Sequence, residues 1–66
     1  MIRITVNGEA REISVAGVEE LLVELSLPAP LMLVEHNGKA LHRSEWPAIR
    51  LNEGDRLELM KVAAGG

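Results

Sequence analysis

The sequence predicts an α+β fold in which one mixed β-sheet packs a single helix across one face. Three observations predict it. Two Asn-Gly pairs, Asn7-Gly8 and Asn37-Gly38, each stand between apolar runs and indicate two β-hairpins. A leucine-rich stretch between them has helical periodicity, and another alternating segment follows near the end of the chain. A lone hairpin is barely stable in water, so both hairpins need a common sheet and the helix to cover it.

The first hairpin is expected over residues 2–15. Its outward strand alternates polar residues with the apolar residues Ile2, Ile4 and Val6. This period of two is typical of a half-buried strand. Asn7 and Gly8 both tolerate positive φ, which a tight two-residue turn requires. The return strand carries Ile13 and Val15 on one side.

The helix is expected from Val18 onward. Its apolar residues fall at i, i+3, i+4 and i+7, on one helical face: Val18, Leu21, Leu22 and Leu25. Glu19 and Glu20 lie in the first turn, where the helix dipole favours negative charge. With Glu24 they form a solvated polar side. Pro28 and Pro30 are expected to end the helix.

The second half of the chain predicts two more strands and a final one. A strand before Asn37-Gly38 closes onto a short return strand over residues 39–41. The segment 43–48 reads as irregular, with Ser44 capping a single turn and Trp46 serving as a local apolar plug. A turn at residues 52–55 leads into the last strand, at residues 56–62.

This element order favours a β-grasp, or ubiquitin-like, architecture. If the first and last strands lie side by side, the helix covers the apolar side of both. Residues 1–62 then form the β-grasp domain and residues 63–66 form a flexible Gly-Gly tail.

Composition excludes several classes of function. The 66 residues make one domain and include no cysteine, which rules out disulfides, zinc-thiolate sites and thiol nucleophiles. The absence of disulfides fits a reducing, cytoplasmic location. No apolar run approaches the roughly 20 residues of a membrane span, and no signal peptide is expected. A net charge of -3 with one aromatic residue argues against nucleic acid as a partner.

The titratable residues do not predict a catalytic or metal site. His36 and His42 flank the second turn, but no third ligand accompanies them, so solvated histidines and no metal are expected. Ser44 has no base beside it. A cluster of Arg50, Asp55 and Arg56 is compatible either with docking an acidic partner or with surface salt bridges. We therefore expect a protein co-substrate of enzymes, with no bound cofactor, and not an enzyme.

The last strand places apolar residues on both sides of the sheet. Leu57 and Leu59 share the side that faces the helix. Met60 and Val62 share the other side and are expected on the open face, next to the tail. Two interpretations stay open: ordinary surface residues, or a docking face, which the adaptability of methionine slightly favours.

The tail suggests chemistry at the carboxylate of Gly66. A carboxylate is inert to nucleophiles until it is activated, and ATP can convert it to an acyl-adenylate with release of pyrophosphate. A sulfur nucleophile can then displace AMP and leave a thiocarboxylate. Extended, the tail spans about 13–14 Å. Gly65 and Gly66 can thread a narrow channel because they lack Cβ, and Ala63 and Ala64 keep the approach slim.

The chain resembles the ThiS family of bacterial sulfur carriers of thiazole biosynthesis. The resemblance is carried by Asn37-Gly38, by "RSEW" at Arg43 to Trp46, by the "L..GDR.E" pattern from Leu51 to Glu58, and by Gly65-Gly66. The opening "VNG" at Val6 to Gly8 followed by the leucine-rich helix also fits. The resemblance implies a β-grasp fold, Gly66 as the modified residue, and a structural role for "RSEW".

The resemblance also implies partners. A ThiF-like adenylyltransferase would adenylate Gly66, a cysteine desulfurase or sulfide would supply the sulfur, and a ThiG-like thiazole synthase would accept it to make the thiazole of thiamine. The alternatives are a carrier for molybdopterin or tRNA thiolation, a ubiquitin-like protein modifier, and an interaction domain whose Gly-Gly is incidental.

Overall fold

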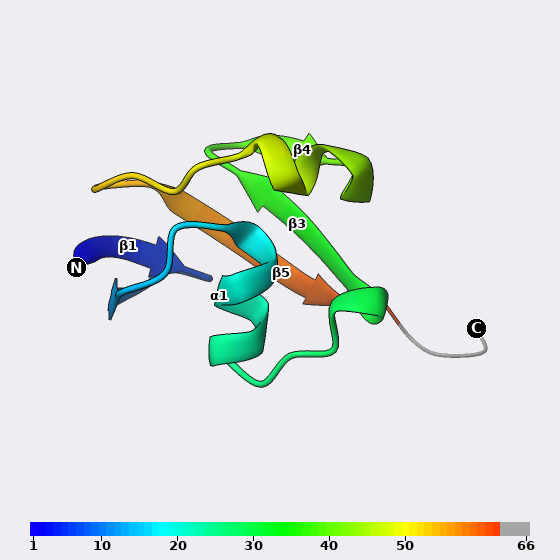
Figure 1. The fold of residues 1–66 in the computed structure, drawn as a ribbon, viewed down its shortest axis with the longest axis horizontal. Helices are drawn as coiled ribbons and strands as arrows, with labels where there is room; N and C mark the ends of the chain where they lie inside the picture. The colour runs from blue at the N-terminus through cyan, green and yellow to red at the C-terminus, as the bar shows by residue number, and fades with distance from the viewer. Residues whose placement is uncertain (63–66) are drawn as a thin grey trace.

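The computed structural model describes residues 1–62, which form five strands, one α-helix and two short 3-10 helices (Figure 1). In chain order the elements are β1 (Ile2–Val6), β2 (Glu9–Ile13), α1 (Val18–Glu24), η1 (Ala29–Leu31), β3 (Met32–His36), β4 (Lys39–Leu41), η2 (Arg43–Ala48) and β5 (Arg56–Lys61). The sheet order is β2-β1-β5-β3-β4. Among the strand pairs within residues 1–62, β1–β5 is the parallel one and the others are antiparallel. This mixed sheet with α1 across one face confirms the predicted β-grasp fold.

Both Asn-Gly pairs form the predicted hairpin turns. Asn7 and Gly8 have φ of 50° and 83°, and Asn37 and Gly38 have φ of 51° and 86°. Two successive positive φ values give a turn whose twist matches that of the flanking strands. The turns pair Val6 with Glu9 and His36 with Lys39.

The core lies between the sheet and the layer formed by α1 and η2. It consists of twelve buried apolar residues: Ile4, Val6, Ile13, Val18, Leu21, Leu22, Met32, Val34, Trp46, Leu51, Leu57 and Leu59. The predicted helical face is confirmed, with Leu25 half-buried at its end. β1 and β5 lie side by side at the centre, so α1 covers the apolar side of both (Figure 1).

The expectation that Pro28 and Pro30 end the helix is wrong. The helix ends at Glu24, and Ser26 takes the left-handed conformation with φ of 59°. Leu27 N–H donates to the carbonyl of Leu22 at 2.8 Å, and Ser26 N–H donates to that of Val23 at 3.0 Å. These two bonds form a Schellman motif, in which glycine is the usual left-handed residue.

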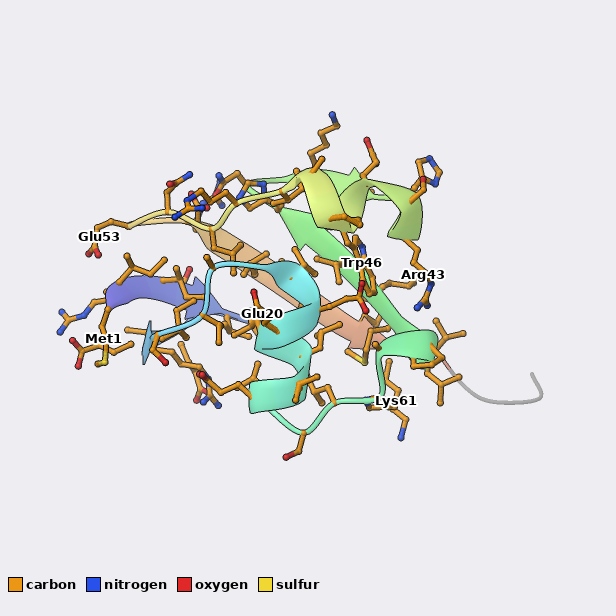
Figure 2. The ribbon with its side chains drawn as sticks, in the orientation of Figure 1. Met1, Glu20, Arg43, Trp46, Glu53 and Lys61 are labelled. Atoms are coloured by element: carbon orange, nitrogen blue, oxygen red, sulfur yellow. The ribbon has the colours of Figure 1, made fainter. Side chains whose placement is uncertain are left out.

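The expected roles of Ser44 and Trp46 are also corrected. Ser44 is exposed, and the turn is closed by Glu45, whose Oε1 accepts the His42 N–H at 2.8 Å. Trp46 belongs to the main core and is not a local plug. Arg43 stacks over its ring at 4.8 Å and donates to the carbonyl of Ala29 at 2.9 Å (Figure 2). The "RSEW" segment therefore anchors η2 to the core and to η1.

Candidate functional site

The candidate site is the last strand, β5, and the open face of the sheet around it. β5 leads into the tail residues Ala63, Ala64, Gly65 and Gly66, which lie outside the described residues, so their roles remain predictions. Of the residues singled out at this end of the chain, Met60 and Val62 lie within the described part.

Both neighbours hold the end of β5 in place. On one side, Val62 N–H donates to the carbonyl of Leu31 at 2.7 Å, which continues the pairing with β3. On the other side β1 ends before it reaches this part of β5, and the Asn7 side chain supplies the hydrogen bonds in its place. Its Oδ1 accepts the Leu59 N–H at 2.7 Å, and its Nδ2 donates to the Leu59 carbonyl at 3.2 Å. The root of the tail is thus fixed by hydrogen bonds on two sides.

The predicted division of β5 between two faces is confirmed. Leu57 and Leu59 are buried under α1, whereas Met60 is 65% exposed and Val62 is 43% exposed. Leu33, which is 56% exposed, lies opposite Met60 in the β3–β5 register. Sequence reasoning missed Leu33 because the strand pairing was needed to place it there. The three residues form a contiguous apolar group beside the root of the tail, which we call the apolar patch.

A shallow groove of about 350 Å³ runs beside this patch over β4, β3 and β5. Its open-face lining comes from Leu33 and Met60 at one end and from Glu35 and Glu58 at the other. The small Ala40 of β4 lines it beside Glu35. The groove therefore joins an apolar end to an acidic end.

A polar cluster ties the start of β5 to the second hairpin. His36 Nε2 lies 2.8 Å from Asp55 Oδ2, and Asn37 Nδ2 donates to Asp55 Oδ1 at 3.2 Å. The Asn52 N–H donates to Asp55 Oδ2 at 2.9 Å. Asp55 is the buried charged residue at the centre of this cluster. His36 is half-buried, so the expectation that it is a solvated turn residue is wrong.

Burial and hydrogen bonding act in opposite directions on Asp55. Burial raises the pKa of the Asp55 carboxyl, because it disfavours the charged form. Hydrogen bonds from His36, the Asn52 amide and Asn37, together with the charge of His36, outweigh burial and hold this pKa below its usual value. Asp55 is committed to this internal network, which corrects the view of it as a surface docking or salt-bridge residue.

The described residues offer no site for a metal ion. Within residues 1–62 there is no group of three or more side chains that could hold one. His42 is exposed at the start of η2, away from the His36–Asp55 pair to which it contributes no contact. No helix in the same part of the chain is long and apolar enough to cross a membrane.

The pattern of turns, core residues and final segment matches a known family along almost the whole chain. The model of the ThiS family matches residues 4–66. The chain belongs to the ThiS family. The resemblance noted in the sequence is thereby confirmed, and the "RSEW" segment that carries part of it has the structural role described above.

Solved structures of a ThiS protein have the same fold as this ThiS-family chain. The crystal structure of the thiamine biosynthesis protein ThiS from Geobacter metallireducens is 33% identical, with a TM-score of 0.83. The alignment covers 98% of this chain and 100% of that chain. The solution structure of a thiamine biosynthesis protein from the same organism is also 33% identical, with a TM-score of 0.78, 98% of this chain and 88% of that chain being covered.

A curated relative is much longer. A thiazole synthase from Paramagnetospirillum magneticum is 33% identical over 66 residues, which include 98% of this chain. This ThiS-family chain spans only 20% of the length of that relative.

Proposed function

We propose that this chain is a sulfur carrier in thiamine biosynthesis, whose C-terminal Gly66 carries the sulfur as a thiocarboxylate. A ThiF-like adenylyltransferase would use ATP to form the acyl-adenylate of Gly66, with release of pyrophosphate. Sulfide would attack the carbonyl carbon and expel AMP, which leaves the thiocarboxylate. A persulfide from a cysteine desulfurase would expel AMP in the same way but form an acyl disulfide, and a thiol would then reduce its S–S bond to release the thiocarboxylate. The sulfur would then pass to a ThiG-like thiazole synthase.

The observation that carries this proposal is the family match, which extends through the Gly65-Gly66 pair. Two relatives support the pathway: the solved neighbours are thiamine biosynthesis proteins, and the curated relative is a thiazole synthase that contains a similar segment. A thiazole synthase is therefore the acceptor that we propose.

The geometry of β5 supports a role as a presented arm. The root of the tail is held between Leu31 and the Asn7 amide, while residues without bulky side chains follow it. A firmly held root lowers the entropy lost when a partner binds the arm in an extended form. The apolar patch lies at this root, and we propose that Met60 and Val62 contact the adenylyltransferase.

The proposal is tested by ATP–pyrophosphate exchange with the adenylyltransferase. We expect exchange that depends on this chain and is lost when Gly66 is deleted, because the reacting carboxylate is then displaced by one residue. The control is Ser44→Ala, which should keep full exchange. A substitution is used here because deletion of Ser44 would disturb η2 and the fold. Exchange that survives loss of Gly66 contradicts the proposal.

A further inference from the structure

Two carboxylates of the same charge lie directly opposite each other on the open face. Glu35 of β3 pairs with Glu58 of β5 in the antiparallel register. Val62 N–H donates to Leu31, and Asn37 N–H donates to Arg56, so the even-numbered residues of β5 direct their backbone groups toward β3. Glu35 and Glu58 therefore form a hydrogen-bonded pair, whose Cα atoms lie about 5.5 Å apart. Like charges in this arrangement destabilise a sheet.

The described residues, 1–62, do not neutralise this pair. Elsewhere on the same face the register places opposite charges together, with Arg3 of β1 opposite Glu12 of β2. In residues 1–62 the ion pair that forms is His36 with Asp55, so no cation bridges Glu35 or Glu58. The nearest basic residue on that face of β5 is Arg56, two positions before Glu58, with its backbone tied to Asn37.

The acid pair is continuous with the apolar patch. The next hydrogen-bonded pair along the two strands is Leu33 with Met60, and both pairs line the same groove. Ala40 of β4 lies opposite Glu35 of β3, and its small side chain leaves the groove open for a ligand. A ligand lying along this groove would meet two aliphatic side chains and then two carboxylates.

We infer that the groove receives an arginine side chain of the adenylyltransferase, with the guanidinium between Glu35 and Glu58 and the aliphatic stem against Leu33 and Met60. This inference rests on the proposed function and names the chemistry by which the partner recognises the open face. An arginine fits because its planar fork binds two carboxylate groups at once, while its methylene stem packs on apolar surface. The bound cation also relieves the repulsion present in the free chain.

The test combines binding and stability measurements on Glu35→Gln and Glu58→Gln. Each change should weaken binding to the adenylyltransferase roughly ten-fold in isothermal titration, because one charge-assisted contact is lost. Each should also raise the Tm of the free chain by roughly 1–5 °C, because the repulsion is removed. Glu24→Gln, an equal change of charge on the helical side, should alter neither quantity.

Salt dependence gives an independent readout. Raising the ionic strength from about 0.05 M to about 0.3 M should weaken binding of the wild-type chain more than that of the Glu35→Gln/Glu58→Gln double variant. The inference is overturned if the glutamine variants bind as tightly as Glu24→Gln while the wild-type chain is adenylated. It is also overturned if sedimentation shows that the wild-type chain self-associates and that Met60→Glu prevents this, since a second copy would then occupy the groove. A wild-type chain that is not adenylated at all contradicts the proposed function itself.

Discussion

The side chain of Asn7 hydrogen bonds to both backbone polar groups of Leu59, 52 residues later in the chain. Asn7 therefore substitutes for the residue that β1 would have supplied had it continued beside β5. The same residue also takes the positive φ of the first hairpin turn. One asparagine thus determines both the turn and the attachment of the strand that leads into the tail.

Replacement of Asn7 should loosen β5. Asn7→Gly keeps the turn conformation but removes both side-chain bonds, and we expect it to lower the free energy of unfolding by about 1–2 kcal/mol. Asn7→Ala should cost about 1 kcal/mol more, because alanine is disfavoured at positive φ. Urea unfolding followed by circular dichroism measures both. Asn7→Gly as stable as the wild-type chain would show that the two bonds contribute nothing.

The Asp55 cluster should make stability depend on acid. The folded pKa of Asp55 is lowered, so its contribution is present above the unfolded pKa of about 3.9 and is lost as pH falls through the folded pKa. Asp55→Asn should lower the free energy of unfolding by about 1–3 kcal/mol at pH 7. It should also make that free energy fall less steeply as the pH drops below about 4. Unfolding midpoints measured from pH 7 down to below about pH 4 test this prediction, with Glu24→Gln as the control. An unchanged acid slope in Asp55→Asn contradicts the assignment.

Ser26 offers a gain in stability. It occupies the left-handed position of the Schellman motif with φ of 59°, where a side chain is disfavoured. Ser26→Gly should raise the free energy of unfolding by about 0.5–1 kcal/mol. Ser26→Ala, which keeps a Cβ, should give no such gain in the same denaturation experiment. Equal stabilities of the glycine and alanine variants would remove the conformational explanation.

The apolar patch is tested by Met60→Glu. If the patch docks the adenylyltransferase, a charge at Met60 should reduce adenylation at least roughly ten-fold while leaving the fold intact. Val23 is 75% exposed on α1, on the opposite side of the sheet. Val23→Glu is therefore a matched control and should leave adenylation unchanged. Full activity of Met60→Glu would exclude the patch as the docking surface.

Local patterns were sufficient to predict most of the architecture. The turns follow from Asn-Gly pairs, and the strands and helix follow from apolar periodicity. The exposure of Met60 follows from its position on the opposite side of the strand from Leu57 and Leu59. These signals act within a few residues of the chain, so they can be recognised without knowledge of the tertiary structure.

The features that escaped prediction depend on contacts between distant segments. Asp55 meets His36 across 19 positions, and Glu35 meets Glu58 only through the register of β3 and β5. Ser26 is different: it takes the left-handed conformation within a local Schellman motif, although serine carries no glycine-like signal for that conformation. The prolines that follow it suggested a later end to the helix than the one the structure has.

The central claim is that Gly66 becomes a thiocarboxylate. Intact mass spectrometry after incubation with the adenylyltransferase, ATP and sulfide tests it most directly. The account predicts that one oxygen is replaced by sulfur, that the change maps to the C-terminal peptide, and that it does not occur without ATP. An unchanged mass in the complete mixture, or a modification that maps to another peptide, would contradict it.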